Sequence, residues 1–251
     1  MYAIEIDKLS KTFGKIEAVK DFSINVPENS IFGLLGPNGS GKSTAIRILC
    51  GVLHPTSGSA KVFGCDVSSQ TEKVRSFLGY MSQKFSLYED LTVIENLDFY
   101  AGIYGINKEL RTERIAELVK TAGLEGRENQ LTGKLSGGYK QRLALVCAMI
   151  HKPKLLILDE PTAGVDPVSR RKFWGIIKRL PSEGITVLVT THYMDEAEIC
   201  DLVVFLFNGK MVDMGTPSEL AKKNDAVSLE DAFIKYVEEI TGSKVADLKE
   251  D

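Results

Sequence analysis

One stretch constrains this chain more than any other feature. It follows the short apolar run Ile31–Leu35 and leads into a helical run that begins at Ala45. The stretch reads Gly36-Pro37-Asn38-Gly39-Ser40-Gly41-Lys42-Ser43-Thr44. An almost continuous apolar run of this length is typical of a strand covered on both faces of a parallel sheet. The order of strand, glycine-rich loop and helix therefore predicts an α/β architecture.

The chemistry of this loop points to a phosphate ligand. Its glycines let consecutive backbone amides curl around an anion at a helix N-terminus, where amide donors and the helix dipole favour negative charge. In this pattern Lys42 would reach the β- and γ-phosphates of a nucleotide, and the Ser43 hydroxyl would bind Mg²⁺. The alternative is a glycine-rich turn without a ligand. The strand before the loop and the helix after it favour the phosphate-binding interpretation.

A second apolar run, Leu155–Leu158, ends in two carboxylates. Asp159, at the carboxyl end of this strand, is the candidate Mg²⁺ ligand. Glu160 is the candidate general base that polarises the attacking water beside the γ-phosphate. On its own the segment could equally be a buried strand that ends in a solvated acidic turn. Together with the phosphate-binding loop, it predicts a nucleoside-triphosphatase site.

The remaining strand signals fall at both ends of the chain. Tyr2, Ile4 and Ile6 alternate with polar residues, as do the apolar residues of 22–26, which predicts half-buried antiparallel strands. Runs at 186–189 and 202–207 predict further buried strands. Asn208-Gly209 is a hairpin turn signal, because a type I′ turn needs positive φ at both positions.

From Leu91 to Ile150 the pattern is helical only. Thr92 and Glu95 have capping-box spacing, and a helix of 108–122 should stop at Gly123. A third helix, after Gly138, is apolar nearly all round and should be buried. The side chains expected to be buried on the first helix are Val93, Leu97, Tyr100 and Tyr104, and on the second Leu110, Ile115, Leu118 and Ala122.

Composition excludes several classes of protein. The net charge of -3 gives no general electrostatic reason to bind nucleic acid or an anionic membrane. The longest apolar run, Leu143–Ile150, is far shorter than the about 20 residues that a spanning helix needs. The charged N-terminus is unlike a secretory signal. The 4 cysteines are scattered, which predicts reduced packing residues rather than disulfides or a zinc site.

A further glycine-rich segment precedes the third helix. It places Ser136, Gly137 and Gly138 at the start of a buried helix, which makes a second anion-binding N-terminus. One chain has no obvious need for two such sites on one nucleotide. Residues 135–142, Leu-Ser-Gly-Gly-Tyr-Lys-Gln-Arg, resemble the signature of the ATP-binding cassette (ABC) ATPases, with Tyr139 where that family usually has Gln.

The resemblance implies roles for four more residues. Phe13 looks like the aromatic residue that stacks on adenine, although a core Phe is the alternative. Gln83 looks like the Q-loop glutamine that touches Mg²⁺ and moves with the membrane partner. Asp166 resembles the D-loop aspartate. His192 looks like the switch histidine bonded to the γ-phosphate, whereas a lone histidine at a strand end would more often be structural.

The resemblance also implies a mechanism. In the ABC family two ATPase domains meet head to tail, so ATP lies between the phosphate-binding loop of one and the signature, here Ser136–Gly138, of the other. Bound ATP then holds the two domains together, and hydrolysis lets the dimer open. The catalytic residues would be Lys42, Glu160 and His192, with ATP and Mg²⁺ as cofactors and a second copy as partner.

Three segments, 161–167, 191–198 and 228–233, resemble the type 2 ABC exporters of drug and multidrug efflux. This implies an ATPase subunit that works with separate integral membrane permease subunits, is cytoplasmic and lies at the inner face of the membrane. Two alternatives stay open. One is a soluble ABC ATPase acting on machinery such as iron-sulfur cluster assembly, and the other is a nucleotide-gated binding module that needs no hydrolysis.

The predicted fold is a P-loop NTPase core with a mainly parallel sheet, an N-terminal antiparallel β subdomain and an inserted all-helical subdomain. The ABC ATPase domain is expected over residues 1–240. Within it, 1–86 and 151–221 would form the nucleotide-binding core and 87–150 the helical signature subdomain. Residues 222–251 would form a C-terminal helix and a charged tail whose last ten or so residues are frayed.

Overall fold

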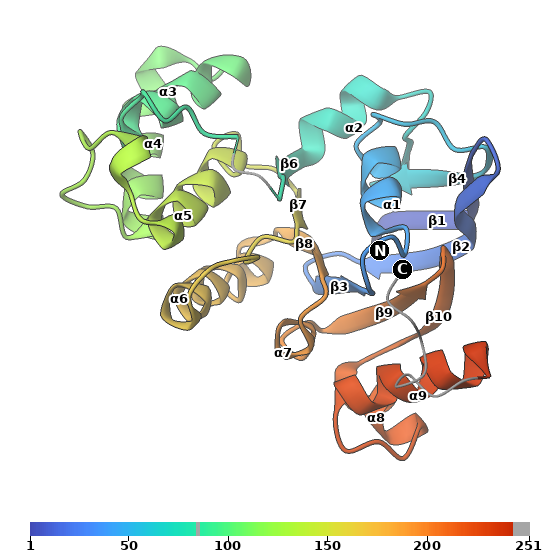
Figure 1. Ribbon diagram of the computed structural model, residues 1–251. Coiled ribbons are helices and arrows are strands. Elements are labelled where there is room, and N and C mark those ends of the chain that lie inside the picture. The colour runs from blue at the N-terminus through green and yellow to red at the C-terminus, as the bar shows by residue number, and fades with distance from the viewer. Residues whose placement is uncertain (84–85, 243–251) are drawn as a thin grey trace. The chain divides into compact units, whose positions relative to one another are not determined.

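The computed structural model describes residues 1–83 and 86–242 and divides the chain into two compact units (Figure 1). The first unit comprises Met1–Val74 and Leu188–Asp251, and the second comprises Arg75–Val187. The helical segment expected over 87–150 lies inside the second unit. The expected frayed tail lies almost entirely outside the described residues.

The first unit begins with an antiparallel sheet. Its strands are β1 (Tyr2–Phe13), β2 (Ile16–Pro27), β4 (Ser57–Val62) and β5 (Cys65–Asp66), in the order β2-β1-β4-β5. The predicted alternation is confirmed, because Ile4 and Ile24 are buried. Tyr2 is 47% exposed, so its predicted burial is wrong. It is the first residue of β1 and pairs with the last residue of β2, where the sheet ends.

A second sheet of the first unit carries the predicted buried strands. β3 (Ile31–Leu35) is buried throughout and pairs in parallel with β9 (Leu202–Phe207). β9 pairs with the antiparallel β10 (Lys210–Gly215). Asn208 and Gly209 join these two strands with φ of 48° and 77°, which confirms the predicted type I′ turn. The predicted strand β8 (Thr186–Thr191), which crosses the boundary between the two units, is buried along its whole length.

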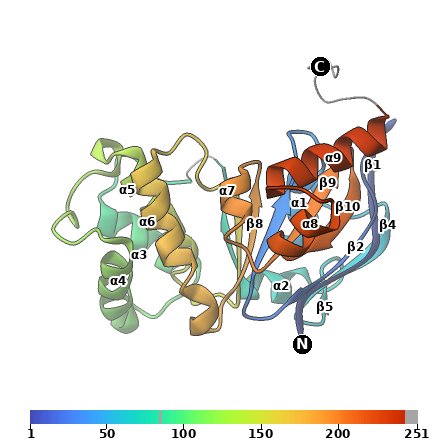
Figure 2. The same ribbon diagram turned by 90° about the horizontal axis from the view of Figure 1, so that it is seen from below.

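Helices follow from local capping signals. The first unit contains α1 (Lys42–Leu49), α7 (Met194–Ala197), α8 (Pro217–Lys223) and α9 (Leu229–Thr241), and α2 (Thr71–Phe77) crosses its boundary. Thr216 and Glu219 form a reciprocal capping box that starts α8. Figure 2 shows α8 and α9 beside β9 and β10. The ring of Phe205 holds α9 through edge contacts with two of its aromatic residues, Phe233 and Tyr236.

The second unit combines two parallel strands with helices. Its strands β6 (Leu78–Met81) and β7 (Leu155–Asp159) pair in parallel register. Its helices are α3 (Val93–Ile103), α4 (Lys108–Ala122), the short η1 (Thr132–Lys134), α5 (Gly137–Ala148), α6 (Pro167–Ile177) and η2 (Leu180–Glu183). α3, α4 and α5 pack together as the predicted helical region.

The helical predictions are confirmed in their bounds and partly wrong in their buried faces. The Thr92–Glu95 capping box is present, and α4 ends at Gly123 in the left-handed conformation. Tyr104 and Leu110 were expected to be buried but are 39% and 61% exposed. Both lie at helix ends, where they line an open surface hollow with Ile106 instead of packing into the helical core.

Two expectations drawn from composition concern membrane-spanning helices and the cysteines, and both can be compared with the described part of the structure. Over 1–83 and 86–242, no helix has the length and apolar character required to span a bilayer. The cysteines Cys50, Cys65, Cys147 and Cys200 are free and buried. Burial raises the pKa of the Cys147 and Cys200 thiols, which keeps them protonated and unreactive. They are packing residues, as predicted.

Candidate functional site

The glycine-rich loop is shaped by the close approach of neighbouring backbone. Gly41 precedes α1 with φ of 105°, a conformation that residues with a Cβ rarely adopt. A Cβ on Gly41 would lie 2.4 Å from the carbonyl oxygen of Ala18, and one on Gly36 would lie 2.2 Å from that of Leu206. The two glycines therefore let the loop lie directly against β2 and β9.

The lysine of the loop is held inside it. Lys42 is 4% exposed. Its Nζ donates hydrogen bonds of 2.6 Å to the Gly36 carbonyl and 3.0 Å to the Pro37 carbonyl. The loop thus places a positive charge among its own backbone groups, next to the first turn of α1. Ser43 is exposed in that turn, so its hydroxyl is accessible to a ligand.

The β9–β10 turn braces the loop from behind. The Gly209 amide donates to the Ser40 carbonyl at 3.1 Å, and its carbonyl accepts from the Lys20 amide at 2.8 Å. Gly209 therefore ties the loop to β2 as well as to its own hairpin. This bracing keeps the loop backbone fixed before any ligand binds, which reduces the entropy that binding would cost.

The first unit also carries His192 and Phe13. His192 is exposed directly after β8, and its turn is fixed by the buried Thr191, whose hydroxyl donates to Glu196 at 2.7 Å and accepts from the Tyr193 amide at 3.0 Å. Phe13 is 45% exposed at the end of β1, so it is not a core residue. An exposed ring can stack on a planar ligand, as the predicted role requires.

The second unit carries the carboxylates and the glutamine. Asp159 ends β7 and is 9% exposed. Glu160 follows it at φ of 46°, a left-handed conformation that non-glycine residues adopt mainly where function or packing demands it. Gln83 Nε2 donates to Glu160 Oε2 at 3.1 Å. The structure therefore brings together two predicted site residues that are far apart in the sequence.

The tip of α5 presents the predicted serine and glycines. Ser136 is its N-cap residue but makes no capping hydrogen bond with its side chain, and Gly137 is exposed. A Cβ on Gly138 would lie 2.1 Å from the Ser169 hydroxyl, so α6 requires a glycine there. Amide groups at this N-terminus are oriented to bind an anion.

Tyr139, the departure from the usual family pattern, is held by two arginines. Its ring lies 4.4 Å from the Arg127 guanidinium and 4.7 Å from that of Arg142. Hydrogen bonding and charge from Arg127 lower the pKa of the phenol. The aromatic ring thus has a structural role beside the tip of α5.

The predicted D-loop residue caps a helix. The Asp166 side chain accepts from the Ser169 amide at 2.9 Å at the start of α6. Hydrogen bonds from Ser169 lower the pKa of this carboxyl. Asp166 therefore shapes the turn after Glu160 in the single chain.

Sequence reasoning missed Gln141. This residue is fully buried on α5 and donates from Nε2 to the Pro161 carbonyl, just after Glu160. It ties the signature helix to the turn that carries the candidate base. The signal was available, because a glutamine inside a helix that is otherwise buried needs an internal partner.

The oxygen donors fit Mg²⁺. The candidate ligands are the Asp159 carboxylate, the Gln83 amide and the Ser43 hydroxyl, which are hard donors of the kind that this ion prefers. Within the part of the chain that the structure describes, no group of three or more His, Cys, Asp and Glu side chains could hold a metal ion.

A family model described as ABC transporter matches residues 19–163, which include the glycine-rich loop, the tip of α5 and both carboxylates. This chain belongs to the ABC transporter family. The ABC chain is 46% identical over 239 residues to the probable multidrug ABC transporter ATP-binding protein YbhF of Escherichia coli (strain K12), covering 93% of this chain and 41% of that protein. It therefore spans less than half of that relative.

Other relatives match the ABC chain over more of their length. The linearmycin resistance ATP-binding protein LnrL of Bacillus subtilis (strain 168) is 38% identical, with 88% of this chain and 71% of that protein covered. A solved ATP-binding subunit of an ABC transporter superposes with a TM-score of 0.83 at 28% identity, covering 94% and 99% of the two chains. The dimeric, post-hydrolysis ATP-binding cassette MJ0796 with ADP and Pi has a TM-score of 0.76 at 28% identity, covering 85% and 98%. The predicted family and P-loop fold are confirmed.

Proposed function

We propose that this chain binds and hydrolyses ATP to drive export through separate membrane subunits. The observation that carries the proposal is the buried Lys42 ammonium, held at 2.6 Å and 3.0 Å from loop carbonyls at the start of α1. A buried cation beside a helix N-terminus is suited to a polyphosphate, because both favour negative charge. Membership of the ABC family identifies that polyphosphate as ATP.

The residues of the chain have separate tasks in this reaction. The amides of Gly39–Thr44 and the Lys42 ammonium bind the phosphates, and Phe13 stacks on the adenine. Glu160 accepts a proton from the attacking water, and Gln83 holds its carboxylate in place. His192 hydrogen-bonds the γ-phosphate. Phosphoryl transfer has a loose transition state, so catalysis consists mainly of this positioning and of charge stabilisation.

Ser43, Asp159 and Gln83 are the residues proposed to hold Mg²⁺. When bound, the ion supplies positive charge that neutralises the phosphate oxygens. The tasks of the neighbouring carboxylates are therefore distinct, since Asp159 holds the cation and Glu160 handles the proton.

The signature residues act on the ATP of a second copy. We infer a head-to-tail homodimer in which Ser136, Gly137 and Gly138 contact the γ-phosphate bound by the partner. The Ser136 hydroxyl makes no capping bond in the single chain, which leaves it available for this contact. Dimeric ATP-binding cassettes among the structural relatives support the arrangement.

Export is supported by the relatives. Their names include a probable multidrug transporter protein, a linearmycin resistance protein and a daunorubicin/doxorubicin resistance protein. We propose that the chain binds integral membrane permease subunits from the cytoplasmic side, at the inner face of the membrane. The resemblance gives no reason to expect a nucleic acid partner.

The proposal is tested with Glu160→Gln. This variant keeps the shape of the side chain but removes the base, so it should bind ATP, lose hydrolysis by at least about 100-fold and accumulate as a dimer with Mg-ATP. Analytical ultracentrifugation and phosphate release measure these properties, with exposed Glu183→Gln as the matched control. A variant that stays monomeric at saturating ATP would contradict the head-to-tail homodimer. Co-purification with a soluble partner instead of a polytopic membrane protein would contradict the export role.

A further inference from the structure

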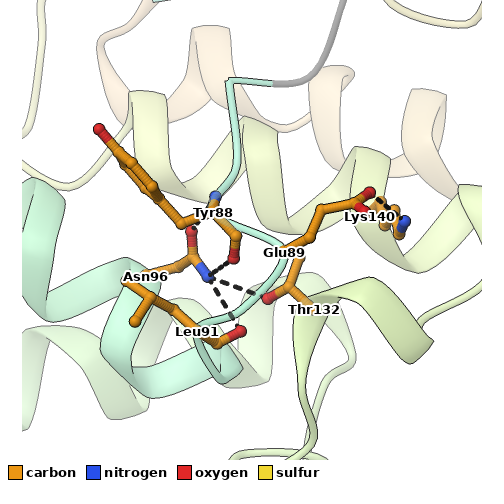
Figure 3. Close-up of polar contacts among 6 residues, drawn as sticks. All are labelled: Tyr88, Glu89, Leu91, Asn96, Thr132 and Lys140. Atoms are coloured by element: carbon orange, nitrogen blue, oxygen red, sulfur yellow. Dashed lines mark hydrogen bonds and ion pairs between the residues drawn. The ribbon is translucent and has the colours of Figure 1, made fainter.

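A buried asparagine organises the irregular segment that follows Gln83. Asn96 lies on α3 and is fully buried. Its Oδ1 accepts from the Tyr88 amide at 2.9 Å, and its Nδ2 lies 2.9 Å from the Tyr88 carbonyl and 3.4 Å from that of Leu91 (Figure 3). The same Nδ2 lies 3.0 Å from the Thr92 carbonyl. Asn96 thus adds side-chain contacts at Tyr88, Leu91 and Thr92 to the backbone hydrogen bonds that segment 88–92 already makes.

The same amide reaches the segment that leads into the signature. Asn96 Nδ2 donates to the Thr132 hydroxyl at 3.0 Å, and Thr132 is fully buried. Backbone bonds run in parallel, from the Thr132 amide to the Leu91 carbonyl and from the Gly133 amide to the Glu89 carbonyl, both at 2.9 Å. Thr132 begins η1, which ends just before Leu135 and Ser136. Asn96 thus fixes the chain on the N-terminal side of the signature.

A charged contact fixes the other side of the signature. The Lys140 Nζ lies 2.6 Å from Glu89 Oε1, and the Lys140 side chain is only 18% exposed. Lys140 stands in the first turn of α5, just after Gly138. Segment 88–92 therefore holds the serine-glycine tip from both flanks, through Thr132 before it and Lys140 after it (Figure 3).

We propose that Asn96 is a positioning residue for the ATP-driven pairing of two copies. Together with Thr132 and the Glu89–Lys140 pair, it holds Ser136–Gly138 in one fixed place relative to segment 88–92. This inference rests on the proposed function, because the tip so held is the one presented to the ATP of a second copy. The hydrogen bonds of the Asn96 side chain go to segment 88–92 and to Thr132, so its role is to position these segments.

The chemistry of the site requires an amide. Asn96 is both acceptor for one backbone amide and donor to backbone carbonyls and a hydroxyl, a combination that neither a carboxylate nor an apolar side chain offers. Aspartate would bring negative charge against the carbonyls of Tyr88, Leu91 and Thr92. Leucine would remove the hydrogen bonds that Asn96 makes with the Tyr88 amide and the buried Thr132 hydroxyl, which is costly.

The test separates the affinity of a single copy for ATP from ATP-driven pairing. All variants carry Glu160→Gln as the parent, and pairing is measured by ultracentrifugation with Mg-ATP. Thr132→Val removes the hydroxyl at nearly constant volume, whereas Thr132→Ser keeps it. We expect Asn96→Asp and Thr132→Val to weaken dimerisation about tenfold or more. Thr132→Ser should restore it, and binding of a fluorescent ATP analogue to the monomer should stay within about twofold of the parent.

A general loss of stability is controlled with Ile177→Ala, which removes a buried side chain at the far end of α6. This variant should lower the thermal midpoint at least as much as Thr132→Val, yet dimerise like the parent. If Thr132→Val dimerises as tightly as Thr132→Ser, the positioning role is wrong, even if Asn96→Asp fails to fold. If the Glu160→Gln parent itself never dimerises, the proposed function fails first, and the inference fails with it.

Discussion

Gln83 and Glu160, separated by most of the helical region in sequence, meet through a hydrogen bond of 3.1 Å from Nε2 to Oε2. The bond fixes one oxygen of a carboxylate whose backbone is already in the left-handed conformation. A general base must keep its orientation to accept a proton from a positioned water. Gln83 therefore orients the carboxylate that we propose as the general base.

We expect Gln83→Ala to lower kcat for ATP hydrolysis about tenfold, the loss that one hydrogen bond to a charged group brings, with little change in KM. Gln83→Asn should behave similarly, because its side chain is one methylene shorter. Steady-state phosphate release measures both constants. Gln70→Ala serves as control, since it also removes a side-chain hydrogen bond, to the Asp66 amide at 3.1 Å. An unchanged kcat in Gln83→Ala would remove the link between the two residues.

Lys42→Ala should reduce ATP affinity by about 10- to 100-fold, because a buried charged donor to the phosphates is lost. Lys42→Arg should be nearly as damaging, because the larger planar guanidinium does not fit a site where the lysine is 4% exposed. Isothermal titration calorimetry measures the affinity, with exposed Lys210→Ala as control. If Lys42→Ala binds ATP with the same affinity as the native chain, the loop is not the phosphate site.

Gly138→Ala should destabilise the fold by roughly 1–3 kcal/mol through overpacking, because its new Cβ would lie 2.4 Å from the Ser169 Cβ. Gly137→Ala is the matched control, since no atom lies within 4 Å of its Cβ position. Urea unfolding measures both free energies. Adding Ser169→Gly should recover part of the loss in Gly138→Ala. Equal stabilities of the two alanine variants would show that α6 does not press on the signature helix.

Acid should weaken the packing of α8 and α9 on β10. Burial raises the pKa of Asp213, but hydrogen bonds from Lys223 and Tyr236 outweigh it and hold that pKa below its usual value. A lowered pKa in the fold means that the carboxylate stabilises the protein above its ordinary pKa of about 4 and loses this effect as the pH falls through the folded value.

Asp213→Asn should therefore lower the free energy of unfolding at pH 7 by about 1 kcal/mol, and its stability should fall less steeply than that of the native chain between pH 5 and 3. The effect is small because the Lys223 side chain is 65% exposed, so water screens its charge. Chemical denaturation across this pH range measures the effect, with exposed Asp90→Asn as control. Parallel pH profiles for the native chain and Asp213→Asn would contradict the assignment.

Local signals were predictable from the sequence and nonlocal packing was not. The Asn208-Gly209 turn and the Thr92 capping box follow from backbone conformation and hydrogen bonds within four residues, and both are as predicted. The exposure of Tyr104 and Leu110 depends on which elements cover the helix ends, which periodicity cannot reveal. Asn96 interrupts the apolar stripe of α3, and a polar residue in such a stripe is the sign of a buried network.

The candidate site divides in the same way. The glycine-rich loop and the Asp159-Glu160 pair are continuous in sequence, so residue spacing alone defines them. Gln83 and His192 could be assigned only through the family resemblance, because a single Gln or His carries no spacing signal. The contact of Gly138 with Ser169 joins two helices that are separated in the sequence, so only the three-dimensional structure reveals it.

The Asn208-Gly209 turn also matters to anyone who modifies this protein. Two-residue hairpin turns are usually safe places for an epitope tag or a fused domain. Here the Gly209 amide and carbonyl are bound to Ser40 and Lys20, so an insertion would displace the loop that we propose as the phosphate-binding site. The Gly126 turn, where an added Cβ would meet no atom within 4 Å, belongs to the other unit and is the better place for a label.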